Sequence, residues 1–329
     1  MVSNKEINNI NKIIEKYNLG KIEEIELLNS SQNNVYKVLT KEGIYIVKEY
    51  SKDAISNYYY LRKRKEQIRI SKILNDNGIN TVLPIEFNNK YFILSRKKYY
   101  LIYNYIDEKV LKEEELTVDN IKTLASIQSK IHKLDIKSTL PCDYKKIKID
   151  FDKYLKISKR LDNDLYETLI NNIDKLNDLI NKNNVYLNDL KNNLCISHND
   201  YKLLNILWKN NELRLIDFDA TGDRNPTCCL CESAFVFSKY NDKIKYDYYK
   251  EYLKTYIKSY GKIKDNFHKS LYVAMNGKIQ WLSYLLSNID NDKRRKDIIC
   301  MINELILYYN NIDKMNQIYL NVSNKQKDY

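Results

Sequence analysis

Two short motifs in the second half of the chain contain the residue types that phosphoryl transfer needs. The first, from His198 to Asn205, reads H-x-D-x-x-x-x-N, and the second is an apolar stretch that ends on Asp217. In such a loop the aspartate, here Asp200, accepts the proton of a substrate hydroxyl, while the amide of Asn205 and the carboxylate of Asp217 hold a metal on nucleotide phosphates. Oxygen ligands of this kind suit Mg²⁺. The spacing therefore predicts a kinase that uses ATP or GTP.

Each of these polar residues also has a purely structural interpretation. Asp200, Asn205 and Asp217 could cap turns or helices, as isolated Asp and Asn side chains often do. We favour the catalytic interpretation because the three residues occur together at the spacing of a catalytic loop and its following strand.

Composition and charge narrow the other functions open to the chain. With 329 residues, 43% of them apolar, the chain can bury a full core. Its net charge of +12 would suit nucleic acid, but no basic block is interleaved with regularly spaced aromatic residues, so we expect no nucleic-acid partner. No apolar run is long enough to span a bilayer, and the N-terminus lacks the apolar core of a signal peptide. We therefore expect a cytoplasmic monomer with no membrane partner.

Three of the six cysteines, Cys228, Cys229 and Cys231, lie close together in the sequence. Zinc sites usually pair two separated Cys or His knuckles, and the sequence lacks a second one. We interpret this cluster as buried thiols that stay reduced in the cytoplasm.

Hydrophobic periodicity predicts an α+β protein with two lobes. The N-terminal lobe, residues 1–105, is expected to bind the nucleotide and to contain an antiparallel sheet with one long helix. Its predicted elements are a helix over 3–18, strands over 21–29, 35–40 and 44–50, a helix over 53–76, and strands over 79–87, 91–95 and 99–106.

The larger C-terminal lobe, residues 106–329, is predicted to be mainly helical and to contain the catalytic loop, the metal site and the substrate pocket. Its expected helices cover 117–134, 150–160, 164–192, 228–239, 245–260, 265–288 and 294–321. Short strands over 194–197, 205–208 and 213–217 are expected to enclose the catalytic loop.

The chain resembles the aminoglycoside phosphotransferase and choline kinase family, small-molecule kinases with the two-lobed protein-kinase fold. The resemblance is carried by Ser197-His198-Asn199-Asp200, Leu207-Trp208, Ile216-Asp217-Phe218-Asp219-Ala220, Asn225-Pro226 and Glu232. It implies that Asp200 lies in the catalytic loop and that Asp217 is a metal ligand. It also implies that His198 is structural and braces the loop against the metal-binding strand.

The resemblance also identifies a candidate lysine for the nucleotide phosphates. Lys48 ends the third predicted strand, just before the long helix, where the family places its phosphate-binding lysine. A carboxylate from that helix is expected to pair with Lys48, and Glu66 is the only acid in the middle of the helix. Glu66 could instead be a surface partner for a neighbouring base one helical turn away.

The rest of the predicted nucleotide site consists of a loop and the junction between the lobes. The loop over 29–36, which includes Ser31, has no glycine, but Ser and Asn can turn tightly and donate hydrogen bonds. The edge of the nucleotide base is expected to bond to backbone groups near Asn104 and Ile106. A G-x-x-x-x-G-K-[ST] motif is missing from the sequence, which argues against a P-loop NTPase.

Several features favour a small cationic acceptor over a protein. Between His198 and Glu232 there are six acids against four bases, a local excess of negative charge in a basic chain. Asp219, Asp223 and Glu232 are therefore candidates to bind ammonium groups, with helix caps or surface pairs as the alternative. Trp281 and nearby tyrosines could form a cation-binding wall, although at helical spacing they are more often core residues.

The acceptor itself stays open at this point. An aminoglycoside-like molecule is our first expectation, and choline or ethanolamine, or an unknown metabolite of a spore or envelope, are alternatives. A spore-coat type of kinase-fold protein that acts only as a binding scaffold is a further alternative. Such a scaffold would be expected to lack one of Asp200, Asn205 and Asp217, and all three are present.

Overall fold

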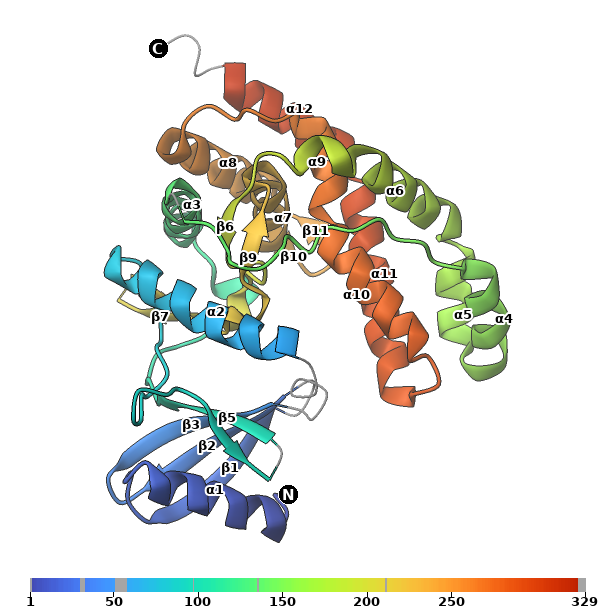
Figure 1. The fold of residues 1–329 in the computed structure, drawn as a ribbon. Helices are drawn as coiled ribbons and strands as arrows, with labels where there is room; N and C mark the ends of the chain where they lie inside the picture. Colours follow the sequence, from blue (N-terminus) through green and yellow to red (C-terminus); the bar gives the residue numbers. More distant parts are fainter. Residues whose placement is uncertain are drawn as a thin grey trace. The chain divides into compact units, whose positions relative to one another are not determined.

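The computed structural model forms two compact units, Met1–Val110 with Asn205–Thr221, and Leu111–Leu204 with Gly222–Tyr329 (Figure 1). The first contains an antiparallel sheet and the second is mainly helical, which confirms the predicted α+β fold class. The hairpin over 205–221, expected in the C-terminal lobe, packs with the N-terminal unit. The structure describes residues 2–29, 33–50, 58–96, 98–134, 136–210 and 212–324.

The first unit contains a five-stranded antiparallel sheet of order β1-β2-β3-β5-β4. The strand expected over 79–87 is wrong: Thr81 forms only an isolated bridge to Leu215, and Pro84 lacks the N–H that a ladder needs. The elements of this unit are α1 (Asn4–Lys16), β1 (Ile22–Asn29), β2 (Asn34–Thr40), β3 (Gly43–Glu49), α2 (Tyr58–Asp76), β4 (Ile93–Ser95), β5 (Lys98–Asn104), β7 (Ile206–Lys209), β8 (Glu212–Leu215) and the 3-10 turn η5 (Phe218–Ala220).

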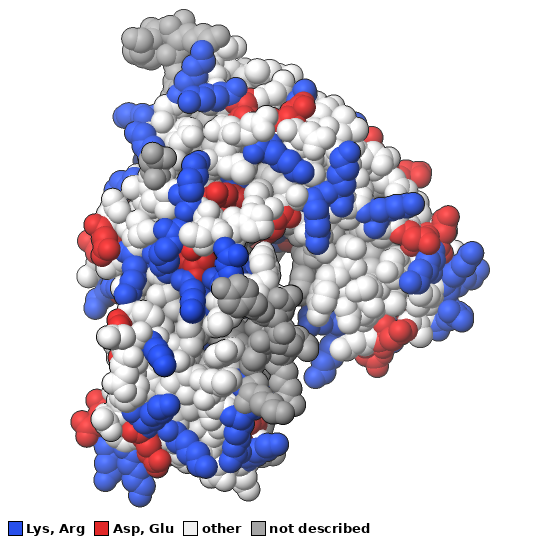
Figure 2. Space-filling model, in the orientation of Figure 1, with Lys and Arg blue, Asp and Glu red and all other residues white. Residues whose placement is uncertain are grey.

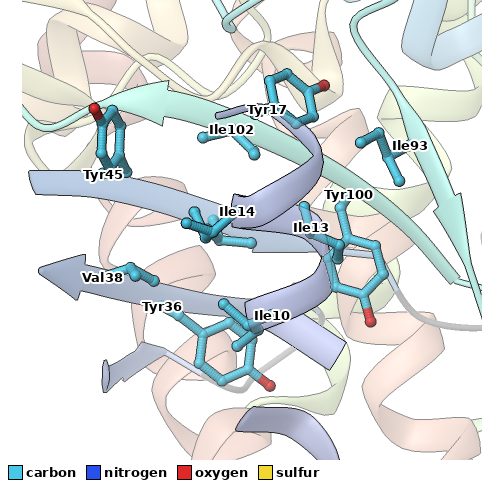
Figure 3. Packing of buried hydrophobic residues seen from close by; sticks show 11 residues of the cluster. Ile10, Ile13, Ile14, Tyr17, Tyr36, Val38, Tyr45, Ile93, Tyr100 and Ile102 are labelled. Carbon is cyan, nitrogen blue, oxygen red and sulfur yellow. The ribbon is translucent and has the colours of Figure 1, made fainter. Parts of the chain in front are cut away.

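Helix α1 covers one face of this sheet. Its start is fixed by a capping box, in which Ser3 accepts from the backbone N–H of Glu6 and the Glu6 carboxylate accepts from Ser3. Figure 3 shows isoleucines of α1, spaced along one side of the helix, packed against tyrosines and aliphatic residues of the strands. The buried residues of this cluster are Ile10, Ile13, Ile14, Tyr17, Tyr36, Val38, Tyr45, Val47, Ile93, Tyr100 and Ile102.

Strand alternation directs Lys48 to the opposite face of the sheet. Tyr45 and Val47 belong to the core under α1, so Lys48, one position further along β3, points the other way. Its register partner on β5 is Leu101, which packs against Ile68 of α2. Lys48 therefore lies on the side of the sheet that α2 covers.

The second unit is built almost entirely from helices, with α3 packed on α8, and α7 packed on both α8 and α9. Three of the long helices expected from the sequence are each divided, for example at Asn171, where α5 ends, and at Asn310, where α11 ends. The helices are α3 (Val118–Lys133), α4 (Phe151–Leu161), α5 (Asn163–Ile170), α6 (Ile173–Tyr186), α7 (Pro226–Ser238), α8 (Tyr246–Tyr260), α9 (Phe267–Ala274), α10 (Asn276–Ser287), α11 (Asp292–Tyr309) and α12 (Ile312–Asn324).

The remaining elements of this unit are short. They are the strands β6 (Cys195–Ser197), β9 (Gly222–Arg224), β10 (Lys239–Tyr240) and β11 (Lys243–Ile244), with 3-10 turns η2 (Glu113–Glu115), η3 (Leu187–Leu190) and η4 (Leu203–Asn205), the last of which runs into the first unit. Across the described ranges no helix combines the length and hydrophobicity of a membrane span. On the face shown in Figure 2, acidic side chains lie among the basic ones.

Candidate active site

The segment that contains Asp200 is anchored by a two-stranded sheet in the helical unit. Strand β6 pairs antiparallel with β9, so that Ser197 lies opposite Gly222. After Ser197 the chain turns through Asn199, which has a left-handed backbone with φ of 62°. The Asn199 amide donates to the carbonyl of Gly222 at 3.2 Å. A non-glycine residue in this conformation is often found at functional sites, and here it directs the chain into Asp200.

Two aromatic side chains support this turn from the core. Tyr201 is buried, and its hydroxyl donates to the carbonyl of Leu124 on α3 at 3.0 Å. His198 is also buried, with its ring centroid 6.2 Å from that of Tyr201. This placement is compatible with the structural role expected for His198, which stays a prediction.

A second buried histidine, which the sequence did not single out, holds the start of the turn. His132 on α3 contacts the Tyr256 hydroxyl through Nδ1 at 2.6 Å and the Ser197 hydroxyl through Nε2 at 3.0 Å. Burial lowers the pKa of His132 to about 3, so its ring is neutral at physiological pH. The sequence gives no local signal for this role, because both hydroxyl partners of His132 are distant from it in sequence.

Asp200 itself remains accessible to solvent. Its side chain is 36% exposed, and Oδ1 lies 2.9 Å from Nζ of Lys202, which is itself 46% exposed. An ion pair with this exposure is weak, so Lys202 can leave the carboxylate at little cost. The carboxylate is therefore accessible from solvent, and its role as the catalytic base stays a prediction.

Asn205 and Asp217 come together in the first unit at the ends of the hairpin formed by β7 and β8. The N–H of Ile216 donates to the carbonyl of Asn205 at 3.0 Å, so the residue before Asp217 is bonded directly to Asn205. Asp217 then takes a left-handed conformation, with φ of 60° and ψ of 67°. The structure therefore brings these two predicted metal ligands to one end of one hairpin.

Lys48 lies between two carboxylates of this same segment. Its Nζ is 2.8 Å from Oδ1 of Asp217 and 2.9 Å from Oδ2 of Asp219. Burial alone would lower the pKa of Lys48, but Asp219 and Asp217 raise it above its ordinary value. Lys48 is thus a fixed positive charge beside Asp217, as a phosphate-binding lysine requires.

The expected pair between Lys48 and Glu66 is not formed between these two described residues. Both carboxylate oxygens of Glu66 accept from Arg69, one turn further along α2, at 2.7 and 2.9 Å. This is the local helical pairing that the sequence left as the alternative. The acids that Lys48 contacts instead come from the hairpin, and a role of Glu66 in nucleotide binding stays a prediction.

Two of the three acids expected to bind an acceptor ammonium already contact cations. Asp219 is bound by Lys48, and Glu232 on α7 lies 3.3 Å from the buried guanidinium of Arg224. Burial raises the pKa of Glu232 even though Arg224 and Lys278 oppose the shift. Asp223 differs, because its carboxylate accepts the backbone N–H of Ser138 at 2.9 Å.

The remaining predicted nucleotide contacts are placed as follows. Asn104 is the last residue of β5, and the N–H of Tyr105 donates to the carbonyl of Ile44 at 3.0 Å, so Ile106 follows the end of the sheet. Ser31 lies outside the described residues. The roles of Ser31, Asn104 and Ile106 stay predictions.

The donor set of the hairpin suits a magnesium ion that also binds phosphate and water. Asn205 and Asp217 offer hard oxygen atoms, and the Asp217 side chain is 39% exposed. The described ranges contain no group of three or more His, Cys, Asp or Glu side chains that would enclose a metal completely. An open site with few protein ligands is the arrangement that magnesium bound to nucleotide phosphates uses.

Comparison with known proteins agrees with this geometry. A sequence profile described as the phosphotransferase enzyme family matches residues 24–228, more than half of the chain. The chain belongs to this family. It is therefore a phosphotransferase, which confirms the resemblance and the kinase class inferred from its motifs. No curated protein matches the sequence.

The fold of the phosphotransferase is shared with several solved structures. A spectinomycin phosphotransferase in complex with ADP and spectinomycin aligns with a TM-score of 0.65 and 15% identity, over 92% of this chain and 98% of the other. An amicoumacin kinase in complex with AMP-PNP and Ca²⁺ aligns at 0.61 and 16%, over 92% and 96%. A microcompartment-associated aminopropanol kinase aligns at 0.59 and 13%, over 93% and 98%. These similarities support the two-lobed kinase-like fold.

Proposed function

We propose that this phosphotransferase moves the γ-phosphoryl group of ATP or GTP to a hydroxyl group of a small molecule, with Mg²⁺ bound to the nucleotide. The observation that carries the proposal is the meeting of Lys48 with Asp217 at 2.8 Å, at the end of the hairpin that also positions Asn205. A buried cation next to an exposed carboxylate provides one group for the phosphates and one for the metal.

In this proposal each group on the hairpin side has one task. Lys48 binds the nucleotide phosphates, which replace one of its two carboxylate partners. Asn205 and Asp217 hold the metal through oxygen atoms. When bound, Mg²⁺ neutralises the negative charge that builds on the phosphates during transfer.

Asp200 acts on the acceptor. Its carboxylate takes the proton of the acceptor hydroxyl as the oxygen of that hydroxyl bonds to the γ-phosphorus, and the bond from phosphorus to the nucleoside diphosphate breaks. The products are a phosphate ester and ADP or GDP, with the proton on Asp200. The turn between Ser197 and Tyr201, held by Asn199 and supported from α3, positions the backbone that bears this carboxylate.

The acceptor that we propose is an alcohol that also contains an amine, with aminoglycoside-like molecules first and choline or ethanolamine as alternatives. Kinases of the same fold act on spectinomycin or aminopropanol, according to their descriptions. In this chain, Asp223 offers a carboxylate that no described cation contacts. An aromatic pair on α10, Trp281 and Tyr284, stacks at 5.0 Å and includes a half-exposed tyrosine.

The test combines nucleotide binding with turnover. Calorimetry with ATP and GTP, with and without Mg²⁺, should show metal-dependent binding, and a coupled assay over aminoglycosides, amino alcohols and choline should identify an acceptor. The Asp200→Asn variant should lose turnover by about 100-fold or more and retain nucleotide binding. Asp119→Asn, an exposed acid at the start of α3, is the matched control and should behave as wild type. Full turnover by Asp200→Asn would exclude this mechanism, and nucleotide binding without turnover on any acceptor would favour a scaffold.

A further inference from the structure

A basic residue of α2, and not its central acid, reaches the charge cluster around Lys48. Nη1 of Arg64 lies 2.8 Å from Oδ1 of Asp219, and Oδ2 of Asp219 lies 2.9 Å from Nζ of Lys48. We propose that Arg64 is the α2 residue that positions Lys48, and that it acts through Asp219. The inference deepens the proposed function, because it takes Lys48 to be the lysine that binds the nucleotide phosphates.

The contacts of Arg64 join it to Gln67, Tyr50 and Asp219. The guanidinium lies 4.3 Å from the centre of the Tyr50 ring, and Nη1 donates to the amide oxygen of Gln67 at 3.0 Å. Gln67 in turn donates to the Tyr50 hydroxyl at 3.2 Å, and that hydroxyl donates to Oδ1 of Asp219 at 3.1 Å. Three elements, namely the end of β3, helix α2 and turn η5, are thereby joined around one carboxylate.

Burial makes these contacts stronger than surface ion pairs. The side chains of Lys48 and Arg64 are 10% and 12% exposed, and that of Asp219 is 21% exposed. Charges that are shielded from water interact more strongly and are more costly to leave without a partner. Lys48 is shared between Asp217 and Asp219, so one cation faces two carboxylates, and Arg64 provides the second positive charge.

The charge balance explains why the position of Lys48 depends on Arg64. Asp219 is shared between two cations, so neither has to neutralise it alone. If Arg64 is removed, Lys48 is the cation that remains on Asp219, and its ammonium group is held there more firmly. A lysine held in this way can approach phosphates only by leaving a buried carboxylate uncompensated. Nucleotide binding should weaken as a result.

Helix geometry assigns this role to Arg64 and leaves Glu66 out of it. Arg64 and Gln67 are one turn apart on α2, and both contact the Tyr50 and Asp219 group. Glu66, two residues after Arg64, faces a different direction around the helix and binds Arg69. The sequence predicted that an acid of α2 would pair with Lys48. In the structure a cation of α2, Arg64, instead binds Asp219, the carboxylate that contacts Lys48.

A double-mutant cycle tests the inference. The dissociation constant of Mg·ATP would be measured by calorimetry for wild type, Arg64→Gln, Asp219→Asn and the double variant, with circular dichroism to confirm folding. Arg64→Gln should weaken binding by about 10-fold, within the range for coupled charged neighbours, and Arg64→Lys should restore part of the loss. In the Asp219→Asn background, Arg64→Gln should have no further effect. Lys65→Gln, an exposed charge on the same helix, is the matched control and should bind as wild type.

The competing results are distinct. If Arg64→Gln weakens Mg·ATP binding equally in the wild-type and Asp219→Asn backgrounds, Arg64 acts independently of Asp219 and the inference is overturned. Wild-type affinity in Arg64→Gln would also overturn it. Greater weakening by Glu66→Gln than by Arg64→Gln would also overturn it. Thermal unfolding of the same four proteins without nucleotide is a separate readout, in which the shifts should not add. If wild type binds no nucleotide, the proposed function fails, while additive shifts in unfolding would refute the contact itself.

Discussion

Acidification should destabilise this protein through His132, the buried histidine behind the turn that leads to Asp200. His132 is 5% exposed, and the neighbours of its ring are the Tyr256 and Ser197 hydroxyls and the rings of Tyr256 and Tyr260. No described carboxylate contacts the ring to favour its charged form. Protonation in the folded state would therefore place an uncompensated charge in the core.

The size of the effect follows from the difference in pKa between the two states. The pKa of His132 is about 3 in the folded protein and 6.5 in an unfolded chain. Between these two values the unfolded state binds more protons, so the free energy of unfolding falls as the pH falls, by about 1.4 kcal/mol for each pH unit. From above pH 6.5 down to pH 5, His132 alone should remove about 2 kcal/mol.

Urea denaturation at pH 7.5, 6 and 5 would measure this loss. His132→Gln removes the titrating group and keeps polar atoms near both hydroxyls. Its free energy of unfolding at pH 7.5 should be lower than that of wild type. Between pH 7.5 and pH 5, however, its free energy of unfolding should fall by about 2 kcal/mol less than that of wild type. Wild type and His132→Gln would be compared in the same buffers, so that the titration of all other groups cancels in the difference. An unchanged slope in His132→Gln would refute the reasoning, because the titration would then belong to other groups.

Four further changes test other parts of the structure. Gly277→Ala would place a methyl group 2.5 Å from Nη2 of the buried Arg224, and we expect a loss of about 1 to 3 kcal/mol in urea denaturation. Tyr201→Phe removes the hydroxyl that donates to the Leu124 carbonyl and should cost about 1 kcal/mol in the same measurement. In Asp217→Asn, the increase in nucleotide affinity that Mg²⁺ produces should be smaller by about 10-fold or more, as measured by calorimetry. Asp223→Asn should raise KM for an amine-containing acceptor and leave nucleotide affinity unchanged, as steady-state kinetics would show.

The parts of the fold that the sequence predicted well depend on local patterns. Buried residues alternate along β2, β3 is a short apolar run, and Gly43 allows the tight connection between these two strands. The offset between Asn205 and Asp217 fits one short hairpin, so these residues had to lie close together once β7 and β8 paired. Divided helices such as α11 and α12 were missed because apolar spacing continues across Asn310, where the helix ends.

The partner of Lys48 could not be predicted in the same way. The sequence shows that α2 contains one central acid among many bases, but it does not give the rotation of the helix about its axis. In the structure Gln67 contacts Tyr50, and Arg64, one turn before it on α2, lies against the Tyr50 ring beside the charge cluster. Tyr50 directly follows β3, and only the folded sheet brings it beside α2.

Counting charges along a segment gave an incomplete picture of the acceptor site for the same reason. The acids between His198 and Glu232 outnumber the bases of that segment, which favoured a cationic acceptor. Two of these acids, however, are already bound by buried cations, some of which lie outside the segment. Lys48 and Arg64 bind Asp219, and Arg224 binds Glu232. An ammonium group would have to compete with fixed, buried partners at both acids. Of the three acids, we therefore expect Asp223, whose carboxylate accepts a backbone N–H from Ser138, to be the one that binds an amine of the acceptor.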